Sequence, residues 1–476
     1  MKRIVIIGGG ITGLAAAHRL VELRKETALE FDVTLLEADS RLRGTIQTEH
    51  RDGFLLERGP DSFISEKPEA LNLAKRAGLE SQLIETSKEN RRSFIVRKGK
   101  LRPVPEGFQL LAPTRLWPFV TSDIFSWAGK ARMAMDLLLP RGDTNGNKDE
   151  SLGHFVRRRL GREALVRMAQ PMVGGIYTAD PETLSLRATM PRFLELEREH
   201  RSLILGMFRQ ARTGHDVPTT GTSGARYSLF LSFERGMQTL VDHLSSRLQR
   251  DTVRLNTRVE SLSLDRASGD WIIKATSVEA IRAQAVCLAL PADAAARLLD
   301  ATDSKLSEEL RGIPYASTAT VNLAYKRVDV PHQLDGFGFV VPFIEKRSLI
   351  ACTFSSVKFA ARAPTDSVLL RAFVGGALQP EMFALDEVEM VSRVRADLRD
   401  LLGIEKAPLF TVVSKWERSM PQYHVGHLDR VKRAGDRLVQ LPGLRLAGSA
   451  FTGAGIPDCI RSGESAADEM IDSLGQ

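Results

Sequence analysis

The first forty residues contain two apolar runs separated by a helical period. Residues 4–7 form an uninterrupted apolar run, and apolar residues then recur at helical spacing from Leu14 to about Leu23. A second apolar run, at residues 33–36, ends at Glu37. Continuous apolar runs are typical of strands buried on both faces of a parallel sheet. The pattern therefore predicts strand, turn, helix and strand, the opening of an α/β fold.

The turn between the first strand and the helix is rich in glycine. Its spacing is G-x-G-x-x-G, in which Gly8 suits a tight turn, Gly10 a close approach of pyrophosphate, and Gly13 close helix–strand packing. The helix N-terminus adds free N–H groups and a partial positive charge. Glu37 is placed to accept hydrogen bonds from a ribose. We predict a dinucleotide cofactor bound by Gly8, Gly9, Gly10, Ile11, Thr12, Gly13 and Glu37.

Beyond residue 63 the pattern changes character several times. A helix, a hairpin and a series of helices are expected first, at 64–83, 94–105, 115–122, 128–139, 151–159 and 163–168. Residues 211–226 are rich in Gly, Ser and Thr and are expected to form a linker or mobile loop. A strand is expected at 253–262, and a two-residue alternation marks the sheet-rich region 306–413. A last strand, a glycine turn and a helix from Pro457 to about Ile471 follow.

These changes predict three domains in an α/β fold that is α+β overall. A Rossmann-like cofactor domain combines residues 1–83, 228–305 and 414–476. Residues 84–227 form a helical domain that covers the substrate or contacts a membrane. Residues 306–413 form a sheet-rich substrate domain inserted into the cofactor domain.

Composition and charge narrow the class of function. The 66 Lys and Arg residues exceed the 59 Asp and Glu residues by 7, which suits an anionic substrate or an anionic membrane surface. No basic run with interleaved aromatic residues is present, so a nucleic-acid partner is not expected. The three cysteines lie far apart, which is typical of a reducing compartment. Prolines and charged residues interrupt the most apolar stretch, Phe108 to Trp127, so we expect a cytoplasmic protein, at most peripheral to the membrane.

Several separated motifs resemble the flavin-dependent porphyrinogen oxidases of heme biosynthesis, within the amine-oxidase-like flavoproteins. They are E-A-x-x-R-x-x-G-x-I-Q-T at 37–48, D-G-F-L-L-E-R-G-P-D-S-F at 52–63, H-R-S-L-I at 200–204, M-P-Q-Y-H-V-G-H at 420–427 and G-A-G-I-P-D-C at 453–459. The resemblance is nearest to the soluble bacterial type that is usually assigned to coproporphyrinogen III. One departure is Arg43, where the superfamily usually has glycine; this cation would pair with a phosphate, push the loop outward, or point into solvent.

The resemblance implies non-covalently bound FAD and a set of residues around it. Cofactor contacts are implied for Ala38, Arg41, Thr45, Gly59, Pro60, Asp61, Ser62, Val259, Trp416, Ala454, Gly455 and Ile456. Substrate contacts are implied for Lys67, Gly174, Gly175 and Ile176, against the alternatives of a surface lysine and of a plain turn between helices. Arg92 and Arg201 are further candidate partners for substrate carboxylates. No catalytic side chain and no metal site are expected, because flavin N5 carries the chemistry and the His424–His427 pair lacks further ligands.

The activity implied is oxidation of coproporphyrinogen III to coproporphyrin III by molecular oxygen, in three rounds that each yield hydrogen peroxide. Protoporphyrinogen IX as substrate, another flavoenzyme of the amine-oxidase type acting on amines or carotenoids, and a non-catalytic dinucleotide-binding scaffold of heme synthesis remain alternatives. Transfer of the product to other heme-synthesis enzymes is a further expectation. Trp117, Phe119, Phe125 and Trp127 form either the core of the helical domain or a lip that touches the substrate or a membrane.

Overall fold

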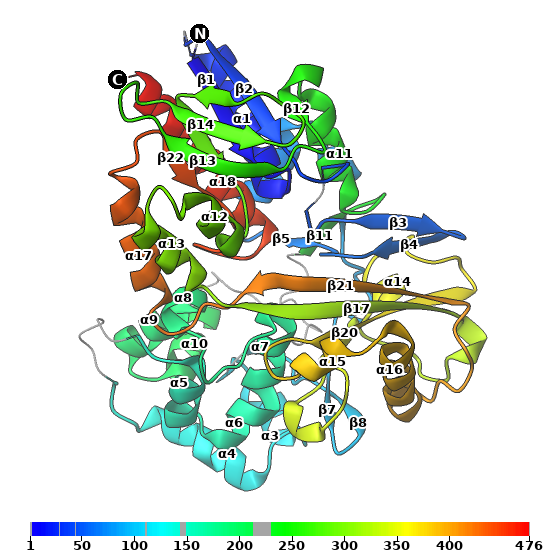
Figure 1. The fold of residues 1–476 in the computed structure, drawn as a ribbon. Helices are drawn as coiled ribbons and strands as arrows, with labels where there is room; N and C mark the ends of the chain where they lie inside the picture. Colours follow the sequence, from blue (N-terminus) through cyan, green and yellow to red (C-terminus); the bar gives the residue numbers. More distant parts are fainter. Residues whose placement is uncertain are drawn as a thin grey trace.

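A computed structural model describes residues 2–27, 29–42, 44–109, 112–142, 149–212 and 230–475. The first strand lies in the middle of a five-stranded sheet at one end of the molecule, drawn at the top of Figure 1. All neighbouring strands in it are parallel. In order across the sheet they are β12 (Val253–Arg254), β2 (Phe31–Leu36), β1 (Lys2–Ile7), β16 (Ala285–Leu288) and β22 (Leu444–Leu446).

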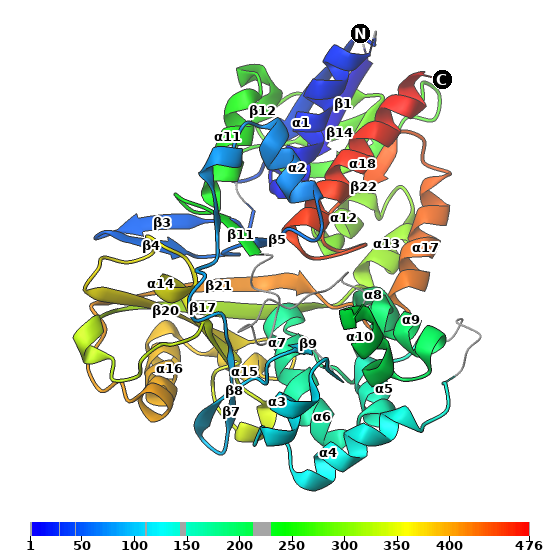
Figure 2. The same ribbon diagram turned by 180° about the vertical axis from the view of Figure 1, so that it is seen from behind.

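Both faces of this parallel sheet are covered, which explains why its strands are apolar throughout. On one face, Ile4 and Ile6 share a core with the helix α1 (Ile11–Glu26), and α18 (Ile456–Gly475) packs beside α1 (Figure 2). On the other face, Val5 and Ile7 share a core with a small antiparallel sheet. Its strands are β13 (Val259–Leu264), β14 (Trp271–Ala275) and β15 (Ile281–Ala283).

The single strand expected at 253–262 is wrong. Residues 253–254 belong to the parallel sheet, whereas residues 259–264 belong to the small antiparallel sheet. Asn256 between them has a φ of 54°, a left-handed conformation that interrupts an extended chain. The other elements around the parallel sheet are β3 (Thr48–Arg51), β4 (Phe54–Glu57), β5 (Phe63–Ile64), α2 (Glu69–Arg76), β6 (Leu83–Glu85), β11 (Phe230–Phe233), α11 (Gln238–Arg247), α12 (Ala292–Leu299), α13 (Ser304–Arg311) and α17 (His427–Leu438).

A seven-stranded sheet forms the second part of the molecule, at the lower right of Figure 1. Its order is β21 (Phe410–Pro421), β17 (Tyr315–Lys326), β20 (Ser367–Gly375), β19 (Ala351–Phe354), β18 (Gly338–Val340), β7 (Phe94–Arg97) and β8 (Lys100–Pro103). The helix α16 (Glu387–Leu402) buries Met390, Val394 and Leu398 in the same core as the sheet. The core side chains alternate with residues of the other face, as the two-residue period predicts.

The hairpin of residues 94–103 joins this sheet, although the sequence pattern groups it with the helices. Phe94 pairs in parallel with Phe339 of β18, and Phe94 and Val96 are buried in the core of the sheet. The strand β21 also starts at Phe410, ahead of the boundary expected at 414. Long-range strand pairing therefore cuts across the expected boundaries, and the division into three domains stays a prediction.

Helices fill the third part of the molecule, at the lower left of Figure 1. They are α3 (Leu116–Thr121), α4 (Trp127–Ala134), α5 (Leu152–Arg159), α6 (Arg162–Ala164), α7 (Gln170–Tyr177), α8 (Leu186–Thr189), α9 (Pro191–His200) and α10 (Leu203–Arg212). Phe119 and Phe125 are buried beside each other, whereas Trp117 and Trp127 are 76% and 73% exposed. Of the loop expected at 211–226, residues 213–226 lie outside the described residues. No helix within the described ranges has the length and apolarity that a membrane span needs.

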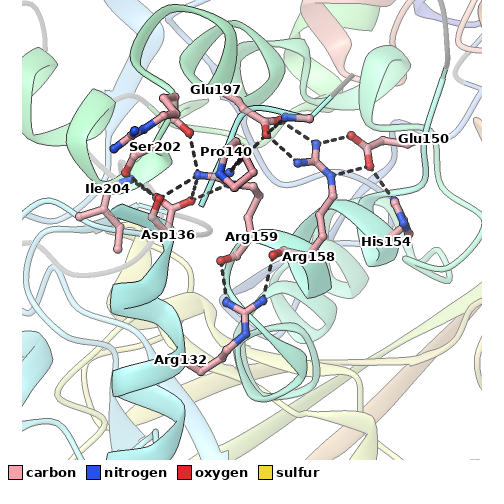
Figure 3. A network of polar contacts seen from close by, with 12 residues as sticks. Arg132, Asp136, Pro140, Glu150, His154, Arg158, Arg159, Glu197, Ser202 and Ile204 are labelled. Atoms are coloured by element: carbon pink, nitrogen blue, oxygen red, sulfur yellow. Dashed lines mark hydrogen bonds and ion pairs between the residues drawn. The ribbon is translucent and has the colours of Figure 1, made fainter. Parts of the chain in front are cut away.

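A buried ion pair connects three of these helical segments (Figure 3). Arg159 of α5 and Asp136 are 1% and 0% exposed, and Arg159 Nε donates to Asp136 Oδ1 over 2.7 Å. The other oxygen of Asp136 accepts from Ser202 Oγ at 2.6 Å and from the Ile204 N–H at 3.1 Å. An adjoining set of pairs joins Arg158, Glu150, Glu197 and His154. Loss of one partner would leave the other charge buried and unpaired, at a cost of about 3–5 kcal/mol. Ser202 and Ile204 of the H-R-S-L-I motif bind Asp136 of this pair, so the motif has a structural explanation.

Candidate functional site

The glycine turn after β1 is shaped by close backbone contacts at two of its four glycines, Gly8 and Gly13. Gly8 has a φ of 110°, and a Cβ added to it would lie 2.4 Å from the Ala289 carbonyl oxygen. A Cβ on Gly13 would lie 1.9 Å from the Gly8 oxygen, so the helix could not approach the strand. At Gly10 the nearest atom to an added Cβ is the Gly44 Cα at 3.8 Å, an ordinary contact that a side chain could make. Packing therefore does not explain Gly10, whereas an approaching pyrophosphate would.

Glu37 lies at the end of β2, directly beside this turn. Its Oε2 accepts the N–H of Gly9 at 2.7 Å, and its Oε1 accepts the N–H of Asp39 at 2.8 Å. These bonds fix the carboxylate, yet each oxygen keeps a free lone pair with which to accept a ribose hydroxyl. The backbone around Arg254 and Thr257 reaches the same place, since Glu37 N–H donates to Arg254 O and Thr257 N–H to Glu37 O. The predicted Val259 therefore follows directly on the chain that lines this end of the site.

The loop after Glu37 is exposed at three of the predicted cofactor residues. Ala38, Arg41 and Thr45 are exposed, as residues of a cofactor-binding edge would be. Gly59 is buried beneath this loop, where an added Cβ would lie 1.7 Å from Thr45 O. The departure at Arg43 lies outside the described residues.

The glycine corner between β22 and α18 adjoins this N-terminal turn. A Cβ on Gly463 of α18 would lie 2.2 Å from Thr12 O, and one on Gly448 would lie 3.9 Å from Thr12 Oγ1. Gly453 has a φ of 152°, and its missing side chain makes room for Asp458. The predicted Ala454 and Gly455 are accessible at the N-terminus of the long helix α18, whose first turn includes the buried Ile456. Two segments more than four hundred residues apart in the sequence therefore form one contiguous cradle.

Buried charges lie behind the predicted segment Gly59–Ser62. Lys358 Nζ is 2.9 Å from Asp61 Oδ2, and Arg371 donates to the Gly59 carbonyl. Burial alone would raise the pKa of Asp61, but Lys358 and Arg371 outweigh it and hold that pKa well below its usual range. The carboxylate of Asp61 is therefore committed to protein partners, so a cofactor contact here falls to the backbone of Gly59, Pro60, Asp61 and Ser62.

Trp416 and Glu57 make hydrogen bonds that hold the chain directly before Gly59. Trp416 lies within β21, and its Nε1 donates to Arg58 O at 3.0 Å. Glu57 is 4% exposed, and its two oxygens accept from Met237 N–H and Thr48 Oγ, each at 2.8 Å. Burial outweighs these hydrogen bonds and raises the pKa of Glu57 to about 7.

The predicted substrate residue Lys67 points at the start of α18. Its Nζ lies 2.6 Å from Asp458 Oδ2, and its side chain is 47% exposed, whereas Asp458 is 4% exposed. Arg461 also donates to Asp458, at 2.7 Å. Tyr177, at the end of α7, is near enough that Asp458 adds to the effect of burial in raising the pKa of its hydroxyl to about 12. Lys67 and the end of α7 therefore converge on the glycine corner from two sides.

The predicted substrate residues Gly174, Gly175 and Ile176 directly precede Tyr177. They do not form the plain turn between helices that was the alternative to a substrate contact. They lie inside the helix α7, whose Met172 and Val173 are buried in the helical core. A Cβ on Gly174 would meet Gln170 Nε2 at 3.5 Å, and one on Gly175 would meet Val340 Cγ1 at 3.6 Å. Both are ordinary contacts, so packing does not require glycine. Gly175 and Ile176 are exposed, with Ile176 at 47%.

The other candidate cations, and His427, have protein partners. Arg92 pairs with Asp335, and Arg201 caps α9 and donates to Leu137 O at 2.9 Å. His427 is buried, and its Nε2 lies 3.0 Å from Phe451 O. Throughout the described ranges, His, Cys, Asp and Glu side chains form no group of three or more that could hold a metal ion.

Comparison with known proteins assigns the chain to a family. The family described as flavin containing amine oxidoreductase matches residues 11–471. The chain belongs to this family. The coproporphyrinogen III oxidase of Bacillus subtilis (strain 168) is 37% identical, over 99% of this chain and 98% of its own length. The coproporphyrinogen III oxidase of Staphylococcus aureus (strain NCTC 8325 / PS 47) is 34% identical, over 99% of this chain and 100% of its own length. The chloroplastic protoporphyrinogen oxidase of Nicotiana tabacum is 30% identical, over 99% of this chain and 86% of its own length.

Solved structures agree on the fold. A crystal structure from Exiguobacterium sp. 255-15, assigned to the protoporphyrinogen oxidases, has 33% identity and a TM-score of 0.87 over 100% of this chain and 99% of that one. Cyclohexylamine oxidase from Brevibacterium oxydans IH-35A has the same fold at 16% identity, with a TM-score of 0.70. The resemblance to flavin-dependent porphyrinogen oxidases and the amine-oxidase-like architecture are confirmed. The cofactor of this flavoenzyme is FAD, and the open side of Gly10 and the contiguous glycine cradle fit it.

Sequence analysis missed Asp458, Lys358 and Tyr423 as residues of this region. Asp458 and Tyr423 lie inside quoted motifs, so their place in the sequence was a usable signal. Lys358 lies in no motif, and its partner Asp61 is 297 residues away, so no local pattern identifies it.

Proposed function

We propose that this flavoenzyme oxidises a porphyrinogen, with coproporphyrinogen III as the substrate, molecular oxygen as the electron acceptor and hydrogen peroxide as the by-product. The observation that carries the proposal is the full-length similarity to bacterial coproporphyrinogen III oxidases, combined with a contiguous FAD cradle. Protoporphyrinogen IX is the second candidate, because relatives at about 30% identity carry that name.

The two glycines of α7 support a flat substrate against the wall that this helix forms. Glycine inside a helix costs roughly 0.5–1 kcal/mol relative to alanine, and alanine would fit at both positions. A chain that keeps glycine there forgoes stability without a packing reason within the described residues. A planar macrocycle pressed against the exposed backbone of Gly175, with Ile176 beside it, supplies that reason for Gly175.

The charges around the corner suit a substrate with carboxylate groups. Lys67 is half exposed and shares Asp458 with Arg461, so its ammonium can turn toward a propionate while Asp458 keeps a cationic partner. Bound FAD supplies the hydride-accepting chemistry. The chain contributes orientation, exclusion of water and a positive environment at the N-terminus of α18.

The test is turnover by the purified holoprotein. Porphyrin fluorescence would be followed with coproporphyrinogen III, protoporphyrinogen IX and a polyamine in parallel, together with oxygen uptake and peroxide formation. We expect the highest kcat/KM for coproporphyrinogen III and stoichiometric peroxide. Turnover of the polyamine alone would refute the proposal, and a higher kcat/KM for protoporphyrinogen IX would replace the substrate.

We also propose a weak contact with anionic membranes through the helical part. Large apolar side chains on the outside of α3, α4 and the following turn include Trp117 and Trp127, and Leu138 is 78% exposed. The buried Lys130 lies beneath this surface, with its Nζ 4.4 Å from the centre of the Trp127 ring and donating to Val120 O, so it holds Trp127 in place. Sedimentation with anionic vesicles should fall for Trp117→Ser/Trp127→Ser, and unchanged sedimentation would refute this contact. Transfer of product to other heme-synthesis enzymes stays a prediction.

A further inference from the structure

Two buried aromatic rings clamp the turn formed by residues 448–455. Tyr423 and His427 are 2% and 4% exposed, and their rings stack at 4.3 Å with an interplanar angle of 16°. The Tyr423 hydroxyl donates to the Ser449 carbonyl. His427 Nε2 lies 3.0 Å from the Phe451 carbonyl, which it contacts as a donor. The start and the middle of the turn are therefore tied to one pair of rings.

The backbone of the same segment is bonded to the helical part. Ser185 N–H donates to Tyr423 O at 2.7 Å, and Val425 N–H donates to Thr183 O at 2.9 Å. Gly426 N–H donates to Asp149 Oδ2 at 2.9 Å. The Tyr423 ring itself belongs to the helical core.

One more bond reaches the predicted substrate wall. Gln422 is 3% exposed, and its Nε2 donates to Tyr177 O at 3.1 Å, at the end of the helix that carries Gly174 and Gly175. The segment from Gln422 to His427 thus has the substrate wall at one end and the glycine corner at the other. The contacts of Gln422, Tyr423 and His427 involve buried side chains, for which a lost partner is costly.

We propose that Tyr423 and His427 are positioning residues for the flavin, and that they couple the 448–455 turn to the helical wall that faces the substrate. The inference rests on the proposed placement of FAD at this turn. It explains why M-P-Q-Y-H-V-G-H carries no recognisable catalytic group. The two rings set the position of backbone that would contact the flavin, and they do not themselves touch the reacting atoms.

The experiment compares four holoprotein variants with wild type. Tyr423→Phe keeps the ring and removes only the hydroxyl; His427→Leu removes the donor to Phe451 O, and His427→Gln restores one. His424→Gln is the matched control, because this histidine of the same segment has no ring hydrogen bond in the described structure. The readouts are the FAD dissociation constant from flavin fluorescence, the visible circular dichroism of bound FAD, kcat and KM separately, and Tm.

We expect Tyr423→Phe and His427→Leu to weaken FAD binding by about fivefold each, the effect of about one net hydrogen bond. They should change the dichroism of the flavin and lower kcat with little change in KM, while His427→Gln recovers most of the loss and His424→Gln matches wild type. A fall in Tm with unaltered FAD affinity, dichroism and kcat would overturn the inference and leave a purely structural role.

Two further variants, Ala454→Val and Gly10→Val, separate this failure from failure of the FAD placement. Ala454→Val adds bulk at the accessible corner and should change flavin affinity and dichroism whether or not the clamp exists. If Ala454→Val is silent while Gly10→Val abolishes FAD binding, the placement at the corner falls and the inference falls with it. If Ala454→Val responds and the Tyr423 and His427 variants do not, the clamp alone is refuted.

Discussion

Replacing the two helical glycines of α7 by alanine should raise stability and lower activity together. Helix propensity favours alanine by roughly 0.5–1 kcal/mol per site. No clash opposes this gain, because the nearest atoms to the added Cβ groups are at 3.5 Å for Gly174 and 3.6 Å for Gly175. The double variant should gain about 1–2 kcal/mol, which corresponds to a rise in Tm on the order of 2 °C for a chain of this size.

The methyl group on the exposed Gly175 would occupy the surface proposed for the porphyrinogen, whereas the one on the buried Gly174 would face Gln170 and Ile350. Forcing a planar ring away from a wall costs about 1–3 kcal/mol, as overpacking does in protein cores, so kcat/KM should fall by about tenfold or more. Thermal unfolding of FAD-saturated protein gives the first quantity, and porphyrin fluorescence gives the second. A double variant with raised Tm and wild-type kcat/KM would show that α7 is not the substrate wall.

The chain offers a matched control for this experiment. Gly435 lies within the helix α17, is exposed, and has no atom within 4 Å of an added Cβ. Gly435→Ala should therefore raise Tm without any change in kcat/KM. A fall in Tm for both α7 and α17 variants would refute the propensity argument itself.

Three further predictions concern charge and the cofactor cradle. Burial raises the pKa of Glu57 from 4.5 to about 7. Ionisation of Glu57 should therefore lower the free energy of unfolding by about 3 kcal/mol as pH rises across that interval. Glu57→Gln should flatten this part of the Tm–pH curve, and an unchanged slope would contradict the prediction. Gly10→Val should keep the wild-type fold but bind no FAD, whereas Gly13→Ala should lower Tm. Far-ultraviolet circular dichroism and flavin content check both variants. Full FAD content in Gly10→Val would refute the proposal that the glycine turn binds FAD. Lys67→Ala should raise KM more than it lowers kcat, while Lys75→Ala, at an exposed pair nearby, leaves both unchanged; equal kinetics for the two would remove Lys67 from the site.

The cofactor domain could be predicted because its signals are local. The turn from Gly8 to Gly13 sits between an apolar run and a helical period, so the three signals confirm one another within a few dozen residues. The structure then supplies the steric reason for Gly8 and Gly13, and leaves Gly10 for the ligand. Local pattern and local geometry agree at this point.

Predictions failed where distant contacts decide the structure. Two adjacent glycines argue against a helix at 174–175 by propensity, but burial of Met172 and Val173 in the helical core overrides it. The hairpin at 94–103 joins a sheet whose other strands come more than two hundred residues later. Lys67 meets Asp458 over a separation of 391 residues, which no sequence period encodes.

The packing of α18 against α1 has a consequence for biosynthesis. The N-terminal half of the nucleotide cradle leaves the ribosome hundreds of residues before the segment that completes it, so newly made chain carries an unfinished apolar surface for most of translation. We therefore expect FAD to be captured only after residues 456–475 have been synthesised, because α18 completes the cradle beside α1. A chain that lacks this helix should bind no FAD.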